Sequence, residues 1–593
     1  MLADEETRCA FLRRAAHARQ LAGNAAIATT TAARSIYADP LTFGIQLARR
    51  SSSARGPLLR AARAMRGDDG QLLRLWLSGD LAGTHASLDE TAERGVFSRL
   101  AAEIAQAAGR PELIVDDSRI HPATRARAAW QLGEATAAIA LLESCAPSSR
   151  LHRAFRAELA LMSPGTRLRW TQRCGEMRAS RSGVLHLLTN SLPHTQSGYT
   201  VRSHAVLLAQ RDAGLSPTAM TRVGYPVVVG GLRAQAIDRV DGVGYHRALP
   251  TWLARTPDGR LLQQADALAA LASRVHPAAL QTTTHYPNAI VVREVAEALD
   301  LPWAYEVRGM LEQTWVASLG SEEARQRALA SERFLLTRKR EAELASAADA
   351  VFTLSGSMRD DLAARGVPRD RVHLVPNGID QQLLKRVPVS AADARASLGL
   401  PLDGFWVGST SSLVDYEGFD VLLDAVALAR EAGHDVRVLL VGDGTARPSL
   451  EQRAASHGLA GHAVFTGRVA RESVADYRDA LDLFVVPRHD RDVTRTVSPL
   501  KPVEAMASGR PLLVSALPPL LESIGAELEQ LHAAVPAGDP AALCARIVEL
   551  TTDDDQRAAL QQRGRARAAT LTWSSVGSTY LRELSAVGAR RGM

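Results

Sequence analysis

The sequence predicts an α/β protein in which two doubly wound parallel sheets follow an all-α segment. Three observations support this prediction. From Gly183 onward, short apolar runs typical of parallel strands alternate with amphipathic helical stretches. Before Gly183, apolar residues recur at helical spacing, with breaks such as Gly109-Arg110-Pro111. The turn sequence Val375-Pro376-Asn377-Gly378-Ile379-Asp380 divides the strand-like runs into two series.

The first 180 residues are rich in Ala, Leu and Arg. Residues 126–143 resemble one helix pair of a tetratricopeptide-like array, but the repeat period is not clean. We therefore expect an α-helical domain built from hairpins. Two roles remain open for it: a scaffold that docks a partner, or a helical cap packed on the rest of the chain.

Length and composition fit a soluble protein of several domains. A chain of 593 residues with 46% hydrophobic and 23% charged residues has the composition of globular domains. No apolar run approaches the ~20 residues of a membrane span, and the acidic start lacks a signal-peptide layout, so we expect a cytoplasmic protein. Cys9, Cys145, Cys174 and Cys544 lack CxxC spacing, so neither a disulfide framework nor a zinc site is expected.

The net charge of +6 arises from the first 180 residues, where basic side chains outnumber acidic ones. A basic surface there leaves open a peripheral contact with the inner face of a membrane, or with a protein partner. An arginine-rich composition of the whole chain is the simpler explanation. No basic stripe is interleaved with aromatic residues, so we expect no nucleic-acid partner.

The expected strands fall into a series before and a series after the turn at 375–380. The first comprises residues 184–189, 226–229, 280–284, 303–307, 350–354 and 372–375, and the second residues 406–409, 436–441, 463–466, 483–486 and 511–514. The expected domains are residues 1–180, 181–376 and 377–575, with a C-terminal helix or tail at 576–593.

Two Rossmann-like domains that face each other across a cleft form the architecture called GT-B. In open α/β sheets, ligands bind beyond the carboxyl ends of the strands, so the cleft is the expected site.

Lys501 is one of only three lysines, with Lys339 and Lys385, among 70 basic side chains. It stands in the segment Pro499–Pro511, which reads PLKPVEAMASGRP, and Glu504 follows one helical turn later. Lysine is a compact point charge that binds phosphate well. A cation and a carboxylate at this spacing suit the diphosphate and the ribose of a nucleotide-sugar. The alternative is a solvated start of a surface helix.

Three further features lie at the ends of strands in the first series. Gly198 follows the first strand where a helix begins, so it either lets the backbone approach a phosphate or only makes the turn. His285 follows a strand that opens toward the cleft, although a lone histidine is often structural. Glu306 and Arg308 share one face of a strand, where they either pair or contact hydroxyl groups of a substrate.

Four motifs in order resemble those of glycosyltransferase family 4. They are PNGID at 376–380, VGDG at 441–444, FTGRV at 465–469 and EAMASGRP at 504–511, and the resemblance covers about residues 183–585. It implies a GT-B fold, a nucleotide-sugar donor as co-substrate, and transfer that retains the anomeric configuration. It also implies that neither a metal nor another cofactor is needed.

Carried over by position, the resemblance implies roles for individual residues. Glu504 matches the second carboxylate of the family's E-x7-E pattern, which holds the donor ribose, and His285 matches a histidine that contacts the transferred sugar. With Lys501 these form the expected catalytic group. The expected donor contacts are Gly198, Tyr199, Ser412, Gly442, Gly467, Arg468, Arg495, Thr496, Val497, Ser498 and Leu500, and the expected acceptor contacts are Asn190, Glu306 and Arg308.

Two departures from the family pattern concern the charges that hold the donor. Thr496 stands where the first carboxylate of E-x7-E would fall, and Ser412 and Glu417 stand where the family has an arginine and a lysine. A subgroup with YEG-F/L-D, PLKPxEAMA and YEVRG motifs is similar to this chain. In that subgroup we expect Lys501, with Arg495 or Arg488, to supply the positive charge.

The sequence thus predicts a retaining transferase of polysaccharide-biosynthesis type. The expected donor is a UDP- or GDP-sugar, and the expected acceptor is a glycan, a lipid-linked sugar or a small molecule. A nucleotide-sugar 2-epimerase is an alternative, but it needs a pair of acid and base groups that the sequence does not assemble. A catalytically silent scaffold that works through its helical domain is another, favoured by the missing cations.

Overall fold

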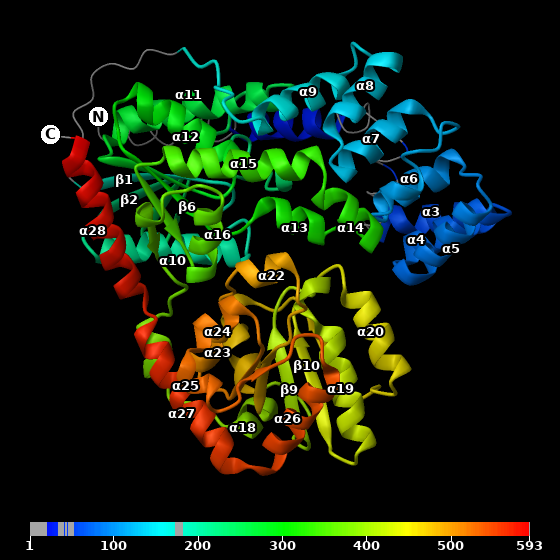
Figure 1. Cartoon of the computed structure of the whole chain (residues 1–593), viewed down its shortest axis with the longest axis vertical. Coiled ribbons are helices and arrows are strands. Elements are labelled where there is room, and N and C mark those ends of the chain that lie inside the picture. Colours follow the sequence, from blue (N-terminus) through cyan, green and yellow to red (C-terminus); the bar gives the residue numbers. More distant parts are fainter. Residues whose placement is uncertain (1–19, 34–40, 42–43, 45–51, 172–181, 592–593) are drawn as a thin grey trace, which may run out of the picture.

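The computed structural model describes residues 20–33, 41, 44, 52–171 and 182–591. Two sheet domains lie one above the other in Figure 1, and a helical domain lies beside the first of them. The helical domain comprises α3 (Ser52–Ala64), α4 (Asp68–Ser78), α5 (Leu81–Glu93), α6 (Arg99–Ala107), η1 (Pro111–Leu113), α7 (Pro122–Leu132), α8 (Ala135–Cys145) and α9 (Arg150–Met162).

The first sheet has the order β3-β4-β2-β1-β5-β6-β7-β8, and all pairs are parallel except β3 with β4. Its strands are β1 (Gly183–Leu188), β2 (Ser216–Thr221), β3 (Ile237–Val240), β4 (Val243–Arg247), β5 (Ala279–Thr283), β6 (Trp303–Val307), β7 (Ala350–Thr353) and β8 (Val372–Leu374). Its helices are α10 (Gly198–Asp212), η2 (Val227–Val229), α11 (Pro257–Val275), α12 (Tyr286–Ala298), α13 (Leu311–Ala317), α14 (Glu322–Leu329), α15 (Glu332–Ala347), α16 (Gly356–Ala364) and η3 (Arg369–Arg371).

The second sheet is parallel, with the order β11-β10-β9-β12-β13-β14. Its strands are β9 (Phe405–Thr410), β10 (Val436–Val441), β11 (Ala463–Gly467), β12 (Leu483–Val486), β13 (Leu512–Ser515) and β14 (Ala534–Val535). The helices of this half are α17 (Gln381–Lys385), α18 (Ala391–Ser397), η4 (Asp415–Glu417), α19 (Phe419–Glu431), α20 (Arg447–Ser456), η5 (Arg471–Ser473), α21 (Val474–Asp479), α22 (Asp492–Thr496), α23 (Lys501–Ala507), α24 (Pro518–Ile524), α25 (Ala526–Glu529), α26 (Pro540–Thr552), α27 (Asp554–Thr570) and α28 (Trp573–Arg591).

Both sheets are wound outward from a central strand, first to one side and then to the other. The direction reverses between β1 and β5 in the first sheet and between β9 and β12 in the second. Ligands of such sheets bind in the crevice at this reversal, outside the carboxyl ends of the strands. The loops after β1, β5, β9 and β12 are therefore the positions where functional side chains are expected.

Buried apolar strands explain why most of the sheet was predictable. Every residue of β7, β12 and β13 is buried and nearly all are apolar, as expected for parallel strands covered by helices on both faces. The expected strand at 226–229 is wrong: residues 227–229 form a single 3-10 turn that Gly230 ends in the left-handed region, with φ of 100°. Strands β2, β3, β4 and β14 were not predicted, because their polar or very short sequences lack a continuous apolar run.

The helical domain is packed onto the first sheet domain. Val316 and Phe334, from α13 and α15, belong to the same buried apolar cluster as the core of α4 to α8. A Cβ atom on Gly133 would lie 2.6 Å from the Trp315 ring, so the two parts approach closely there. Glu332 accepts hydrogen bonds from the backbone and the hydroxyl of Thr136, both at 2.8 Å. Of the two roles left open by the sequence, the arrangement is that of a packed cap.

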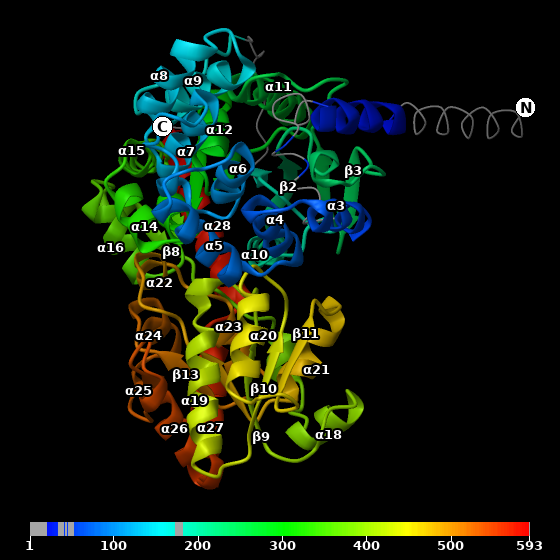
Figure 2. The same cartoon turned by 90° about the vertical axis from the view of Figure 1, so that its right-hand side faces the viewer.

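A helical stretch at 20–33 lies beside β3 on the flank of the first domain (Figure 2). Ile27 is buried in the core of that domain, and the Asn24 amide donates to the carbonyl oxygens of Leu232 and Ala234 at 3.0 and 2.9 Å. The N-terminal region therefore contacts the first domain on two sides.

Helix α28 leaves the second domain and returns to the first, where it packs along α10 (Figure 1). Gly577 allows this close approach, since a Cβ atom there would lie 2.3 Å from the Ala209 carbonyl oxygen. We expect Gly577→Val to destabilise the protein by about 1–3 kcal/mol through overpacking. Gly588→Val is the matched control on the same helix, because a Cβ atom there meets nothing within 4 Å. Thermal melts of both variants test this, and equal melting temperatures would contradict it.

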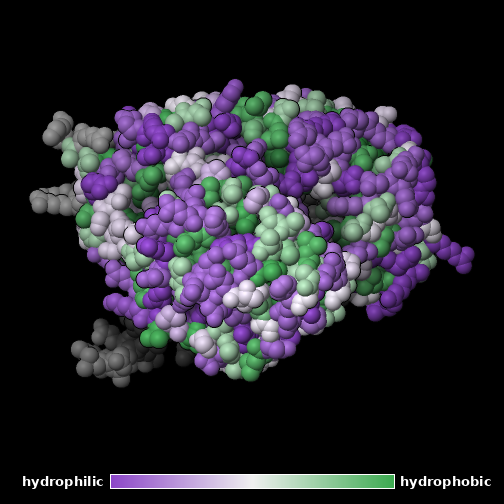
Figure 3. Space-filling view, turned by 60° about the horizontal axis from the view of Figure 1, so that its bottom comes forward, coloured by the Kyte–Doolittle hydropathy of each residue, from purple (hydrophilic) through white to green (hydrophobic). Residues whose placement is uncertain are grey.

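The surface in Figure 3 is mostly hydrophilic, with hydrophobic residues scattered among the polar ones, which is ordinary for a protein surface. Among the described helices, none is both long and apolar enough to cross a membrane. Cys145 and Cys544 are free thiols, whereas Cys9 and Cys174 lie outside the described residues.

Candidate functional site

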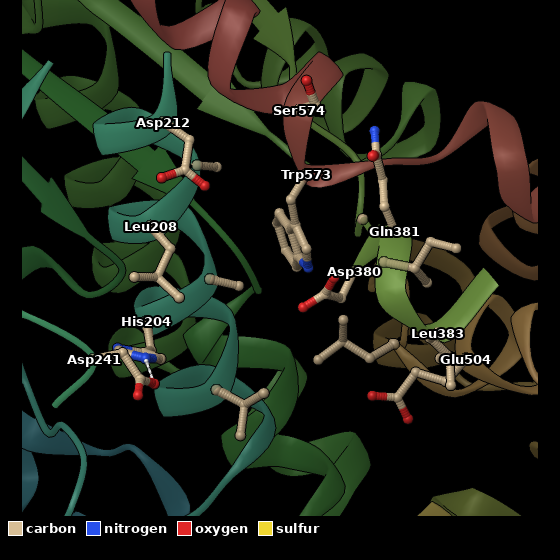
Figure 4. Close-up of a pocket in the computed structure, with 16 residues that line it drawn as sticks. His204, Leu208, Asp212, Asp241, Asp380, Gln381, Leu383, Glu504, Trp573 and Ser574 are labelled. Carbon is tan, nitrogen blue, oxygen red and sulfur yellow. Dashed lines mark hydrogen bonds and ion pairs between the residues drawn. The ribbon is translucent and has the colours of Figure 1, made fainter. Parts of the chain in front are cut away.

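A cavity of about 400 Å³ lies between the two sheet domains (Figure 4). One wall is α10, with His204 and Leu208, and the other carries Asp380, Leu500 and Glu504. Trp573 stands between these walls in Figure 4. The cavity brings Leu500 and Glu504, both expected at the donor, to the interdomain cleft.

Lys501 belongs to a cluster of charges at the reversal point of the second sheet. Its Nζ donates to Glu417 Oε2 at 2.5 Å and to Ser411 Oγ at 2.7 Å. Arg488 binds the same carboxylate through Nε at 3.2 Å and Nη2 at 3.0 Å. Ser411 and Glu417 follow β9, and Arg488 follows β12. Two cations therefore share one carboxylate, which leaves a single excess positive charge.

The electrostatics of the cluster hold Glu417 ionised and make Lys501 easy to deprotonate. Burial by itself would raise the pKa of Glu417, but the charges of Arg488 and Lys501 hold that pKa at about 2. Burial lowers the pKa of Lys501 to about 8, although the neighbouring Glu417 carboxylate opposes this effect. A diphosphate placed against Lys501 would favour its charged form and raise the pKa again.

The affinity for a nucleoside diphosphate is therefore expected to depend on pH around the pKa of Lys501. Below pH 8 the ammonium is charged and binding is strongest, and above pH 8 the neutral amine leaves the diphosphate with less compensation. We expect the dissociation constant to rise by up to about tenfold for each pH unit above 8. In Lys501→Arg this rise should disappear, since arginine keeps its charge. Titration calorimetry between pH 7 and 10 measures the dissociation constants of the wild type and of Lys501→Arg. A wild-type dissociation constant that does not change with pH would rule out this role of Lys501.

The glycines of the second-domain motifs allow neighbouring loops to pack closely against each other. Cβ atoms on Gly442 and Gly444 would lie 1.9 and 2.1 Å from the carbonyl oxygens of Ser411 and Leu413. Gly467 has a φ of 72° and pairs with Gly442 in an isolated bridge. These glycines thus bring the loops after β9, β10 and β11 together. Ser412 and Arg468, on two of these loops, are exposed.

The segment before α23 is hydrogen-bonded to the interdomain segment and to the loop after β12. The Ser498 carbonyl accepts from the Asn377 amide at 3.2 Å, and the Val497 carbonyl accepts from Arg488 at 2.9 Å. The Thr496 hydroxyl is buried and donates to the Asp492 carbonyl at 2.9 Å, so it closes a helical turn. Arg495 differs from the expectation for a donor cation, because its side chain is 57% exposed and paired with Asp490.

Glu504 accepts from Arg478 at 2.9 Å, and a third of its side chain is exposed to the cleft. Arg478 is buried, so this contact fixes the carboxylate from one side and leaves the other side open. That arrangement suits a carboxylate that accepts hydrogen bonds from a pair of hydroxyl groups.

On the first domain, Gly198 opens helix α10, which Ser197 and Thr200 cap reciprocally. A Cβ atom on Gly198 would meet nothing within 4 Å, so the space beside it is open. Tyr199 follows and is half exposed. Asn190 lies in the loop after β1, and its buried Oδ1 has no hydrogen-bond partner among the described residues. These positions fit a loop that faces the cleft.

Glu306 and Arg308 differ from the expectation for acceptor contacts. Both are buried, and Arg308 Nη2 binds Glu306 Oε2 at 2.8 Å. Arg202 of α10 binds the other carboxylate oxygen at 3.0 Å and reaches Asn377 at 2.8 Å. Burial alone would raise the pKa of Glu306, but the two arginines hold it at about 2. The ion pairs of Glu306, Arg308 and Arg202 hold α10, β6 and the interdomain segment together. Glu306 and Arg308 thus pair with each other, which was one of the two roles expected from the sequence.

His285 stands at the start of α12, directly after β5. Burial, with a smaller contribution from the charge of the nearby Arg222, lowers its pKa to about 4, so the imidazole is neutral at pH 7. Its Nδ1 has no hydrogen-bond partner among the described residues. Arg222 follows β2 and is a candidate that the sequence did not reveal, because β2 itself was not predicted. The one feature of the sequence that could have identified Arg222 is its place as a charged residue directly after a strand.

Both sheet domains are similar to known families and folds. Residues 404–553 match the family model described as Glycosyl transferases group 1, and residues 197–378 match the model described as Glycosyl transferase 4-like domain. The 2-deoxystreptamine glucosyltransferase of Streptomyces kanamyceticus is 29% identical over 206 residues, which are 34% of this chain and 51% of that protein. The chain thus spans about half the length of this curated relative.

Two solved structures show the same fold. Sucrose-phosphate synthase from Thermosynechococcus elongatus has a TM-score of 0.55 at 21% identity, covering 69% of this chain and 100% of that one. HepE of Anabaena, in complex with UDP, has a TM-score of 0.50 at 18% identity, covering 68% and 100%. The GT-B architecture expected from the sequence, two Rossmann-like domains after a helical region, is confirmed.

Proposed function

We propose that this chain is a glycosyltransferase that moves a sugar from a nucleotide-sugar to a hydroxylated acceptor in the cleft between its two sheet domains. The observation that carries the proposal is the cluster of Lys501, Arg488 and Glu417, at the point where the winding of the second sheet reverses. Its excess positive charge lies where an open α/β sheet binds its ligand, and the matched family models cover both domains.

The reaction breaks the bond between the anomeric carbon and the β-phosphate oxygen and forms a bond from that carbon to the acceptor oxygen. The acceptor hydroxyl proton passes to the departing phosphate oxygen, so atoms and charge balance without a protein nucleophile. Negative charge grows on the diphosphate, and fixed cations stabilise it more than they stabilise the ground state. Lys501 and Arg488 supply those cations, and Glu504 orients the ribose. Transfer on one face of the sugar retains its anomeric configuration.

A UDP- or GDP-sugar is the proposed donor. HepE of Anabaena, which shares the fold, was solved with UDP. The proposed acceptor is a glycan, a lipid-linked sugar or a small polyhydroxylated molecule, and the aminocyclitol acceptor in the name of the Streptomyces relative is of the last kind. No metal takes part in the proposed step, so activity should be unchanged by a chelator.

A panel of UDP-, GDP- and ADP-sugars tests the proposal in two stages. One donor is expected to raise the melting temperature, because a ligand that binds only the folded state stabilises it. With an acceptor present, the same donor should release its nucleoside diphosphate and yield a product with unchanged anomeric configuration by NMR. A panel that neither stabilises the chain nor releases diphosphate would contradict the proposal.

A further inference from the structure

A second cavity, of about 250 Å³, is built jointly by the helical domain and the first sheet domain. Helix α9 of the helical domain contributes Glu158 and Met162, the start of α12 contributes His285, and α13 and α15 contribute Trp315 and Arg333. Helix α9 packs against α11 and α15, as Figure 1 shows. The Thr337 hydroxyl on α15 contacts Met162 Sδ at 3.8 Å, which fixes α9 at this wall.

Within the described residues, the polar groups of this cavity are less fully hydrogen-bonded than those of the surrounding domain interface. Arg167 pairs with Glu294 at 2.8 Å, and other charges there are similarly paired. By contrast, Glu158 and Arg333 attract each other without a side-chain hydrogen bond to any described residue, and His285 Nδ1 is also without one. Burial raises the pKa of Glu158 and lowers that of Arg333. A buried polar atom without a partner, such as His285 Nδ1, is costly, so its retention at a cavity indicates a ligand.

The shape and charge of the cavity restrict the ligand. Its volume is below the ~300–1,000 Å³ of sites for drug-sized molecules, so it holds about one six-membered ring. Glu158 and Arg333 carry opposite charges, the Glu312 carboxylate is paired with Arg365 at 2.7 Å, and His285 is neutral, so the lining favours an uncharged ligand. Trp315 and Met162 supply apolar walls. The Arg333 guanidinium lies over the Trp315 ring, 4.4 Å from its centre. A ring with hydroxyl groups on its edges and apolar faces matches this lining.

The cavity lies at the edge of the first sheet that faces the second domain. His285 follows β5, and α13 follows β6 after a short loop. In that loop, a Cβ atom on Gly309 would lie 3.9 Å from Val497 of the second domain. The loop that leads into α13, whose residues Leu311 and Trp315 line the cavity, thus reaches the second domain.

We propose that this cavity binds a neutral polyhydroxylated ring of the acceptor, and that Glu158 of the helical domain accepts hydrogen bonds from its hydroxyl groups. The helical cap then determines acceptor specificity rather than only covering the sheet domain. The identification of the ring as part of the acceptor rests on the proposed function. The binding of a ring to the cavity can be tested without a donor.

Saturation-transfer NMR on the full chain tests it with glucose, N-acetylglucosamine and myo-inositol as neutral rings, and glucosamine and glucuronate as charged ones. We expect at least one neutral ring to bind, with affinity reduced about tenfold or more in Glu158→Gln, since a hydrogen bond to a charged group is lost. Met162→Trp, which fills the cavity, should abolish binding. Glu143→Gln is the control, because that glutamate is exposed on α8 of the same domain.

The inference is overturned if no neutral ring binds, if a charged ring binds in preference, or if Glu158→Gln binds as the wild type does. Nucleotide-induced melting shifts in the same variants report on folding and on the donor site separately. If the chain binds rings at Glu158 but no nucleotide, the proposed function is contradicted and the assignment of the cavity is supported. If nucleotides still raise the melting temperature but no ring binds, the assignment of the cavity is contradicted and the proposed function is supported.

Discussion

Replacing Lys501 with alanine is expected to lower the rate of glycosyl transfer by about 100- to 1,000-fold, the range seen when one group that stabilises transition-state charge is removed. The variant loses the ammonium next to Glu417, while Arg488 still pairs with that carboxylate, so the fold should persist. The cluster then has no excess positive charge for the departing diphosphate. Steady-state rates with a saturating donor measure the effect.

Lys339→Ala is the matched control for this variant, since Lys339 is an exposed lysine on α15 of the first domain. It should retain full activity. Lys501→Arg keeps the charge but not the compact geometry, so it should lie between the wild type and Lys501→Ala. If Lys501→Ala turned over at the wild-type rate with an unchanged melting temperature, the role of the cluster in catalysis would be refuted.

Replacing Glu504 with glutamine is expected to weaken nucleoside diphosphate binding by about tenfold or more, because charged hydrogen bonds to the ribose hydroxyls contribute roughly 1.5–3 kcal/mol. The exposed side of the carboxylate faces the cavity between the domains, which gives it access to a ribose. A 2′-deoxynucleotide provides the matched comparison. The wild type should discriminate against it, and Glu504→Gln should discriminate much less.

Glu504 also pairs with the buried Arg478, so its replacement affects stability as well as binding. Glutamine keeps a hydrogen-bond acceptor for Arg478, and a melting curve without ligand separates the two effects. Equal discrimination between the ribo- and deoxynucleotide in both proteins would show that Glu504 does not contact the ribose.

The strands with continuous apolar sequences were predictable, because a buried parallel strand needs apolar residues on both faces. This accounts for β7, β12 and β13. The same criterion misidentified residues 226–229, where a valine run closes a turn before Gly230. It missed β2, whose polar start gains its partners only from β1 and β4.

The charge cluster shows why the site was only partly predictable. The sequence singled out Lys501, and it showed Glu417 where the resemblance implied a cation. That Glu417 lies between Lys501 and Arg488 depends on the carboxyl ends of β9 and β12 meeting at one edge, which local sequence does not encode. Glu158 of the helical domain belongs to no motif, and it becomes a candidate only because α9 packs against α15 at the second cavity.

Proton uptake on binding of a nucleoside diphosphate tests the central claim, that the Lys501 ammonium meets the donor diphosphate, most directly. Calorimetry at pH 8 in buffers of different ionisation enthalpy measures it, with whichever of UDP, GDP or ADP binds best. Lys501, with a pKa of about 8, is half protonated in the free protein, so binding should take up about half a proton. Lys501→Arg should take up none. Binding with no proton uptake by the wild type, or with equal uptake by Lys501→Arg, would contradict the claim.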